Sequence, residues 1–417
     1  MSKQRQTSNG ARRILIFSLT YHPFVGGAEI AIKEITDRLS KEKYAFDMIT
    51  LRFDRALPKV EKVGNVTVYR LGPAIRAPSV SDRNMKWQLR LAKVLFPISS
   101  FIKAFFLDQK YVYDMLWAMM ANQASFSALF FKFIHPKTPY FLELQDGRAI
   151  ADMKARRPIL RLLWPLYKRM YMKADRIKAI SHYIAKEVRS IGYKKDIEVI
   201  PNGVDVGTFT RPSPPSRVEE LKKKVGKHPG DIFLFTASRL VLSRGVEDVI
   251  RALPALPAHV KLLVAGTGED QQKLERIASE AGIQERVIFA GHVPHEILPA
   301  YFAISDIFVR PSIIEGFGSA FIEAFAVGIP VIATPVGGIP DFLFDPDANP
   351  DKEPTGLFCE VQNPESIARC VTRYMEEPKL KARIIKNARA LASEKYDWNR
   401  IARDMEERIF DPLLKSI

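Results

Sequence analysis

Cysteine is almost absent from this 417-residue sequence, which contains only Cys359 and Cys370. Two cysteines cannot build the disulfide framework of a small secreted domain, and they offer too few ligands for a zinc site of the cysteine and histidine type. A reducing compartment fits this composition. We therefore expect a cytoplasmic protein.

A hydrophobic leader and a long apolar run are also missing. The first ten residues, MSKQRQTSNG, are polar, so we expect no signal peptide. The longest stretch without a charged residue, Met115 to Phe131, is interrupted by four polar residues between positions 122 and 127. This pattern favours a strand followed by a buried helix over a membrane-spanning helix.

The positive charge, +16 in total, is concentrated in the first half of the chain. Residues 1–210 contain 36 basic and 18 acidic side chains, a net charge of +18, whereas residues 211–417 contain 27 and 29, a net charge of −2. A basic half can attract nucleic acid, an anionic membrane leaflet or a phosphorylated substrate, and charge alone does not choose among them.

Short apolar runs alternate with helical stretches in both halves. In the first half, a helix over 28–39 accompanies predicted strands at 13–20, 114–120, 140–145, 176–181 and 198–201. In the second half, strands at 231–237, 260–265, 286–290, 306–311 and 330–334 are separated by helices at 246–253, 270–281, 297–303 and 319–327. A proline-rich and lysine-rich stretch, 211–230, lies between the two series. The pattern predicts an α/β protein with two Rossmann-like, doubly wound domains facing a central cleft, where ligands would bind.

The segment 306–341 contains the most specific chemistry. A buried strand leads into a glycine-rich loop and then into a helix that begins near Ser319. The backbone N–H groups of Gly316, Phe317, Gly318 and Ser319 would point out of the positive end of that helix, which suits a phosphate group.

Two carboxylates flank this loop, Glu315 before it and Glu323 within the helix. Carboxylates accept hydrogen bonds from vicinal hydroxyls such as those of a ribose or hexose. The alternative is that Glu315 only caps the helix and that Glu323 lies on a solvated face.

Loops elsewhere supply further candidates for an anion site. Arg239 and Arg244 follow the strand at 231–237, and arginine side chains suit phosphate oxygens, although two surface arginines would give the same pattern. Gly26 and Gly27 precede the first helix and would offer backbone amides, a signal that plain tight packing also explains.

Together these segments resemble the retaining glycosyltransferases of family 4, also described as glycosyl transferases group 1, which have the GT-B fold. The resemblance covers nearly the whole chain and rests on FVGGAE at 24–29, PNGVD at 201–205, SRLVLSRG at 238–245, GTGEDQQKLE at 266–275 and RPSIIEGFGSAFIEAFAVGIPVIATPVGG at 310–338. It implies an acceptor-side domain at 1–206, a nucleotide-sugar domain at 207–396, and a helix at 397–417 that returns to the first domain.

The resemblance also implies residue roles. Arg239 and Arg244 would hold the donor diphosphate, and Glu323 the ribose hydroxyls. Glu315, together with the amides of Gly316, Phe317 and Gly318, would hold the transferred sugar and phosphate, while Gly26 and Gly27 would close over the phosphates. The reaction would proceed with retention of configuration and would need neither a metal nor another cofactor.

This chain departs from the family pattern at two positions. Arg244 stands where the family usually has lysine, which keeps the charge and changes the contact geometry. Gln145 and Asp146 stand where the family often has histidine at the end of a strand. Glutamine can orient a sugar hydroxyl and cannot act as an acid or base at neutral pH. We therefore interpret Gln145 and Asp146 as positioning residues, with an ordinary loop contact as the equal alternative.

Two basic and apolar segments bear on the acceptor. Residues 148–178 contain ten lysines and arginines among leucines and aromatics, and residues 85–107 are similar. Such segments can lie on an anionic membrane, or they can be helices that pack their apolar faces on the sheet. We expect a hexosyltransferase that moves sugar from UDP or GDP to a lipid-linked or saccharide acceptor in cell-envelope glycan synthesis, acting as a peripheral protein on the inner membrane face.

Other classes of protein explain fewer of these features. A sugar-nucleotide epimerase of the same fold would use a similar donor and transfer nothing, so it remains the main alternative. A Rossmann dehydrogenase would need G-x-G-x-x-G after the first strand, where this chain has VGGAE. A nucleic-acid-binding protein would leave the acidic second half unexplained, so we expect no nucleic-acid partner.

Overall fold

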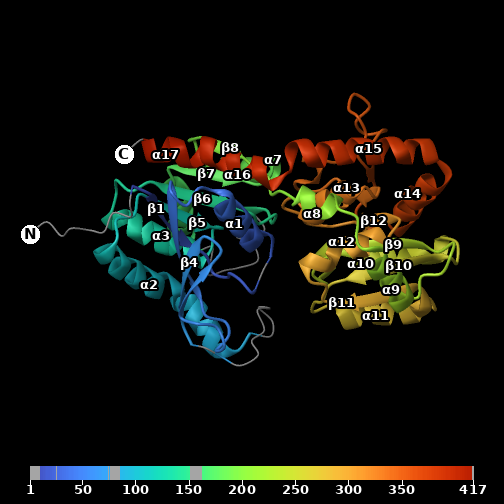
Figure 1. Ribbon diagram of the computed structural model, residues 1–417, viewed down its shortest axis with the longest axis horizontal. Coiled ribbons are helices and arrows are strands. Elements are labelled where there is room, and N and C mark those ends of the chain that lie inside the picture. Colours follow the sequence, from blue (N-terminus) through green and yellow to red (C-terminus); the bar gives the residue numbers. More distant parts are fainter. Residues whose placement is uncertain (1–9, 25, 74, 76–84, 151–161, 416–417) are drawn as a thin grey trace, which may run out of the picture. The chain divides into compact units, whose positions relative to one another are not determined.

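The computed structural model describes residues 10–24, 26–73, 75, 85–150 and 162–415 (Figure 1). The first nine residues and residues 151–161 of the basic segment singled out above lie outside this range. The chain forms two compact units: unit 1 comprises Met1–Asn202 and Trp398–Ile417, and unit 2 comprises Gly203–Asp397. The resemblance placed these divisions at 206/207 and 396/397.

Unit 1 is built on an eight-stranded sheet in the order β3-β4-β2-β1-β5-β6-β7-β8. Its strands are β1 (Arg12–Phe17), β2 (Tyr44–Leu51), β3 (Val60–Val63), β4 (Val66–Leu71), β5 (Met115–Met119), β6 (Tyr140–Leu144), β7 (Arg176–Ala179) and β8 (Ile197–Val199). All neighbours run parallel except β3 and β4. The strands β2, β3 and β4 were not predicted from the sequence.

Helices cover the sheet of unit 1. They are α1 (Gly27–Arg38), α2 (Trp87–Lys110), α3 (Gln123–Ile134), α6 (Trp164–Met172), α7 (His182–Ser190), α16 (Trp398–Met405) and α17 (Asp411–Lys415), with a π-helical stretch at Glu406–Phe410 joining the last two. Trp398, Ile401 and Met405 belong to the same buried cluster as Ile14 and Trp117, so the C-terminal segment is part of the core of unit 1. No helix within the described ranges is both long enough and apolar enough to cross a bilayer.

Unit 2 contains a six-stranded, fully parallel sheet in the order β11-β10-β9-β12-β13-β14. Its strands are β9 (Ile232–Ala237), β10 (Val260–Ala265), β11 (Val287–Gly291), β12 (Ile307–Arg310), β13 (Val331–Ala333) and β14 (Leu357–Phe358). The helices are α8 (Val206–Thr210), α9 (Pro215–Val225), α10 (Val246–Ala252), α11 (Gln271–Glu280), α12 (Leu298–Ala303), α13 (Ser319–Val327), α14 (Pro364–Glu376) and α15 (Pro378–Lys395).

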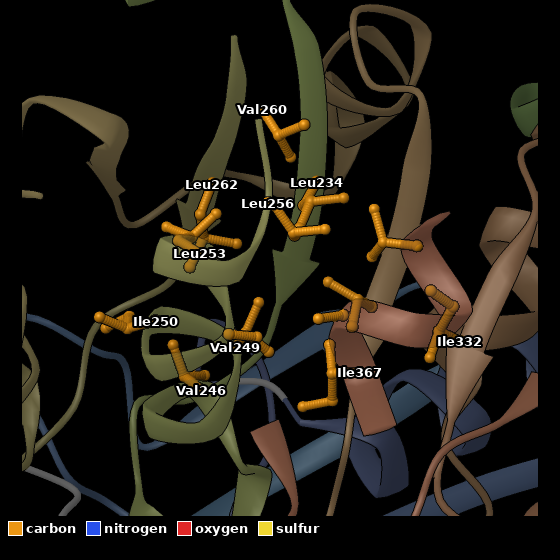
Figure 2. Packing of buried hydrophobic residues seen from close by; sticks show 14 of the residues in the cluster. Leu234, Val246, Val249, Ile250, Leu253, Leu256, Val260, Leu262, Ile332 and Ile367 are labelled. Carbon is orange, nitrogen blue, oxygen red and sulfur yellow. The ribbon is translucent and has the colours of Figure 1, made fainter. Parts of the chain in front are cut away.

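One layer of the core of unit 2 lies between its sheet and the helices of one face, and Phe302 of α12 and Phe321 of α13 pack on the other face. Figure 2 shows Leu234 of β9 and Leu262 of β10 beside Val246 and Val249 of α10, with Ile367 of α14 close by. All five side chains are buried. Strands buried on both faces carry continuous apolar runs rather than alternating ones, which is why the runs at 232–237 and 260–265 could be recognised in the sequence.

Each sheet reverses its strand order at one point. In unit 2, β9 has β10 on one side and β12 on the other, and in unit 1, β1 lies between β2 and β5. In open parallel sheets, ligands bind outside the carboxyl ends of the strands at such a switch point. The prediction of two doubly wound α/β domains is confirmed, and the loops after β9 and β12 become the first place to look for a site.

Candidate functional site

The loops after β9 and β12 pack directly on each other in unit 2. Ile313 donates its backbone N–H to the carbonyl of Ser243 at 2.9 Å. Gly245 has a positive φ of 72°, and a Cβ at this position would lie 2.0 Å from the carbonyl oxygen of Pro311. Only glycine therefore permits this close approach of the two chains. The contact brings Arg244 beside Glu315.

Glu315 is held by two arginines. Arg244 Nη1 donates to its Oε2 at 2.7 Å, and Arg310 Nη2 donates to the same oxygen at 2.9 Å. The hydroxyl of Ser312 lies 3.4 Å from that oxygen. Glu315 is buried, and no described group donates to its Oε1. The carboxylate is thus fixed by one oxygen, and the other is left to accept a hydrogen bond.

Arg310, which sequence analysis missed, ends β12 and is buried. Nη1 donates to the carbonyl of Ala237 at 3.2 Å, so its guanidinium links β9 to β12. The guanidinium carbon lies 4.3 Å from the ring centre of Phe321. Burial lowers the pKa of Arg310, and the negative charge of Glu315 opposes that shift. In the sequence, Arg310 is recognisable only as a charged residue at the end of an apolar strand. A charged residue on the surface of the protein would give the same pattern.

The start of α13 presents free backbone donors. Gly318, with φ at 95°, precedes the first helical residue, Ser319. None of the N–H groups of Gly316, Phe317, Gly318 and Ser319 donates to another group in the described ranges. These amides stand at the positive end of a nine-residue helix, as the sequence predicted, and suit an anion.

Glu323 lies one turn into α13 and is buried. Its Oε1 is 3.0 Å from Nε2 of His295, which precedes α12. The charge of Glu323 also acts on Arg310. Glu323 is therefore part of the same charged cluster as Glu315 and Arg244 and is not a solvated face residue. His295 positions this carboxylate, a role that its place in a loop could not reveal.

Arg239, in the loop after β9, differs from these residues. Its side chain is exposed and makes no ion pair with any residue that the structure describes. Arg239 thus stands at the same edge of the sheet as Arg244, with a guanidinium available to a ligand.

The loop after β13 packs against the backbone of Glu315. Gly338 donates its N–H to the carbonyl of Glu315 at 3.2 Å, and Gly337 has φ of 57°. A Cβ on Gly337 would lie 1.7 Å from that carbonyl oxygen, so one of the two segments would have to move.

We expect Gly337→Ala to lower the free energy of unfolding by more than about 1 kcal/mol, because the strain of a positive φ adds to a backbone collision. Gly282→Ala is the matched control, since Gly282 has φ of 67° and no atom within 4 Å of a Cβ. Thermal denaturation followed by circular dichroism compares the two variants. Equal losses of stability would contradict the packing of Gly337 on Glu315.

Unit 1 contributes a second group of predicted residues. Gly26 precedes α1, and its N–H donates to Oε2 of Glu29 at 2.8 Å. Burial raises the pKa of Glu29, while hydrogen bonds from Thr20 and Gly26 oppose that shift. The amide of Gly26 is therefore already engaged, which limits what it can offer to a phosphate.

Gln145 connects α1 to a buried network. A Cβ on Gly27 would lie 3.7 Å from Nδ2 of Asn202 and 3.9 Å from Oε1 of Gln145. Asn202 Nδ2 donates to Oε1 of Gln145 at 3.0 Å, and Gln145 Nε2 donates to Oε1 of Glu143 at 2.8 Å. Gln145 is thereby oriented from both ends. Asn202, within the PNGVD segment, was not assigned this contact from the sequence.

Glu143 and Lys178 form a fully buried ion pair beneath Gln145. They are direct partners in the register of β6 and β7, and Lys178 Nζ lies 2.6 Å from Oε1 of Glu143. Trp117 Nε1 donates to Oε2 of Glu143 at 3.1 Å. Each charge interrupts an apolar strand in the sequence, and only the pairing of the two strands shows that they meet.

Asp146 does not join this network. Its carboxylate accepts hydrogen bonds from Arg148, whose Nε lies 3.0 Å from both carboxylate oxygens.

The structure thus brings Gly27, Gln145 and Asn202 together in unit 1. It brings Arg244, Glu315 and Glu323 together in unit 2, where Arg239 stands at the same sheet edge.

Two family models match the chain around these residues. The model described as glycosyl transferases group 1 matches residues 217–391, and the model described as glycosyltransferase family 4 matches residues 137–208. The first range contains Arg239, Arg244, Glu315 and Glu323, and the second contains Gln145. The two models together match 247 of the 417 residues, and the chain is a glycosyltransferase of the type that they describe.

Curated relatives of this glycosyltransferase agree with that assignment. An uncharacterized glycosyltransferase of Methanocaldococcus jannaschii is 26% identical over 402 residues, which is 94% of this chain and 96% of that protein. A GDP-mannose-dependent alpha-(1-6)-phosphatidylinositol monomannoside mannosyltransferase of Mycolicibacterium smegmatis is 30% identical over 243 residues, which is 55% of this chain and 61% of that protein.

Solved structures show the fold of this glycosyltransferase. Sucrose-phosphate synthase from Thermosynechococcus elongatus superposes with a TM-score of 0.80 at 21% identity, covering 97% of this chain and 100% of that one. HepE from Anabaena, solved in complex with UDP and glucose, has a TM-score of 0.74 at 20% identity, covering 96% and 100%. These structures confirm the predicted GT-B fold, while the assignment as a glycosyltransferase rests on the family models.

Proposed function

We propose that this enzyme transfers a hexose, with retention of configuration, from a UDP- or GDP-linked sugar to a lipid-linked or saccharide acceptor in cell-envelope glycan synthesis. The observation that carries the proposal is the cluster in unit 2, where Glu315 is held by Arg244 and Arg310 at the sheet's switch point. The nucleotide choice is supported by the GDP-mannose dependence of the mycolicibacterial relative and by the UDP bound to HepE.

Residues of unit 2 would bind and stabilise the negatively charged diphosphate of the donor. Arg239 and Arg244 can bind diphosphate oxygens, and the amides of Gly316 to Ser319 can receive the charge that develops when the glycosidic bond breaks. These groups provide the positive charge themselves, which supports our proposal of a reaction without a metal. Glu323, positioned by His295, would accept hydrogen bonds from the ribose.

The sugar itself would lie near Glu315. Because Oε2 of Glu315 is occupied by two arginines, Oε1 is the atom that would accept a hydroxyl hydrogen. In unit 1, Gln145 is fixed by Glu143 and Asn202 and would orient a sugar hydroxyl without exchanging a proton. Asp146 would assist Gln145, and Gly26 and Gly27 would lie over the phosphates.

A donor screen by thermal shift tests the proposal. A ligand that binds only the folded protein at 100 times its Kd stabilises that protein by about 2.7 kcal/mol. We expect a UDP- or GDP-linked hexose to raise the melting temperature progressively with concentration, and an ADP-linked sugar to raise it less. If no nucleotide sugar raises it, the donor assignment is wrong.

The outer face of α2 supports a peripheral membrane location. Eight large apolar side chains of this helix are exposed at helical spacing: Trp87, Leu91, Val94, Leu95, Ile98, Ile102, Phe105 and Phe106. Lysines and arginines lie between them, as on helices that insert into the interface of an anionic membrane. Other residues of α2, such as Phe96 and Leu107, pack inside unit 1, so packing on the sheet explains only one face of the helix.

We expect the enzyme to co-sediment with anionic liposomes at low salt and to dissociate as salt is added, because surface charges are screened. Phe106→Glu, at a side chain that is 64% exposed, should weaken the interaction. Val361→Glu, at another exposed apolar residue that lies in unit 2, is the control and should not. Failure of the unaltered protein to sediment would remove the membrane from the proposal.

A further inference from the structure

A pocket of about 670 Å³ lies within unit 1. Its walls come from α2, α3, α6 and α7 and from the loops that follow β1, β5 and β6. Most of its lining is apolar, including Phe126, Phe130 and Leu166. Small-molecule pockets have volumes of about 300–1,000 Å³, so this one is large enough for a substrate group.

The inner end of the pocket lies at the carboxyl edge of the sheet. Gln145 and Asp146, which follow β6, line it there together with Asn122, the residue that caps α3. These three residues are polar, and Lys93 of α2 and Glu187 of α7 line other walls. Gln145 is also the residue that the Asn202 and Glu143 hydrogen bonds orient.

The outer end opens on the exposed face of α2, which runs along the outside of unit 1 (Figure 1). Val94 and Ile98 line the pocket, yet they are 68% and 55% exposed. Side chains that both line a pocket and face solvent mark its mouth. The pocket is therefore continuous with the apolar stripe of α2.

We propose that this pocket binds the hydrocarbon chain of the acceptor. The acceptor would be an amphiphile whose chain passes Val94 and Ile98, and whose hydroxyl-bearing head group lies at Gln145 and Asp146. This assignment rests on the proposed function, in which Gln145 orients a sugar hydroxyl and the acceptor can be lipid-linked.

The chemistry of the walls favours a hydrocarbon over a saccharide. Hydroxyl groups lose their water hydrogen bonds against apolar side chains and gain nothing in return, whereas a methylene chain gains from leaving water. The carboxyl edge of the sheet provides the hydrogen-bonding groups of Asn122, Gln145 and Asp146, where a head group would stop. A mouth on an apolar surface also allows a chain to enter from a bilayer without crossing water.

Isothermal titration calorimetry of the full chain with n-alkyl β-D-glucosides of six to nine carbons, below their micelle concentrations, tests the proposal. Each methylene taken into the pocket should tighten binding about fourfold. Ile98→Trp should abolish this increment by filling the mouth. Ile102→Trp is the matched control: it lies one turn along the same helix, is 48% exposed, and does not line the pocket. It should keep the increment.

A third variant tests the orientation of the chain. Gln145→Ala should weaken every glucoside by the same factor and leave the increment per methylene unchanged, because only the head group reaches Gln145. The pocket assignment would be overturned if the unaltered protein showed no gain in affinity per methylene, or if Ile98→Trp and Ile102→Trp showed the same gain. It would also be overturned if Gln145→Ala bound the glucosides as tightly as the unaltered protein does.

Donor stabilisation is measured on the same preparations, which keeps the two proposals apart. If a nucleotide sugar raises the melting temperature and the glucosides show no increment, the pocket assignment fails and the proposed function stands. If no nucleotide sugar raises it, the proposed function itself fails.

Discussion

Arg239→Ala should lower kcat/KM for the nucleotide-sugar donor by about 30-fold to several-thousand-fold, equivalent to ~2–5 kcal/mol of donor or transition-state binding. The physical reason is that the variant lacks the permanent positive charge that would stabilise the diphosphate as it leaves the sugar. Steady-state kinetics with the donor identified by thermal shift measures the effect. Because Arg239 is exposed and makes no ion pair with the described residues, the melting temperature without ligand should not change.

Arg251→Ala is the control for this prediction. Arg251 lies on α10 in the same unit, is exposed, and pairs with Glu247 one turn away. Its removal deletes a positive charge without touching the switch point, so kcat/KM should stay close to that of the unaltered enzyme. Unchanged kcat/KM in Arg239→Ala, or an equal loss in both variants, would remove Arg239 from the donor site.

Lys178→Ala should lower the free energy of unfolding of unit 1 by about 3–5 kcal/mol, the scale for breaking a buried ion pair by removing one partner. Glu143 would remain buried with only the neutral donors Trp117 and Gln145. All four tryptophans of the chain, at 87, 117, 164 and 398, belong to unit 1. Denaturant unfolding followed by tryptophan fluorescence therefore reports on this unit.

Two controls separate the buried charge from the loss of a lysine. Lys33→Ala removes a lysine of α1 that pairs with Asp37 at the surface, which should cost about 0.3–0.5 kcal/mol. The double variant Lys178→Met with Glu143→Gln removes both charges and keeps an oxygen that can accept from Trp117. It should recover most of the lost stability. A double variant as unstable as Lys178→Ala would show that the buried charge is not the cause.

Much of the fold could be predicted because its strands are short, continuous and apolar. The runs ending at Ala237 and Ala265 are buried on both faces, so no polar alternation obscured them. The strands from Val60 to Leu71 were missed because they lie at one edge of the sheet, where exposed and half-buried residues interrupt the apolar pattern.

The site was predictable where a local rule applied and was missed where residues meet across the sheet. Gly316 to Ser319 could be placed at a helix start because glycine and the following apolar periodicity mark one. Arg310 and the pair of Glu143 with Lys178 could not, because each is a single charge within an apolar strand. The order of the strands in each sheet decides which residues these charges contact, and that order cannot be read from a single sequence. The exposure of the α2 stripe was equally hidden, since an apolar helical face is usually a buried one.

The central claim is that unit 2 binds the diphosphate of the donor, and a crystal structure with UDP or GDP tests it most directly. The measurement is the position of the two phosphorus atoms. We predict phosphate oxygens within hydrogen-bond distance of the guanidinium groups of Arg239 and Arg244 and of the backbone N–H groups between Gly316 and Ser319. A nucleotide bound with its phosphates away from the loops after β9 and β12 would contradict the account.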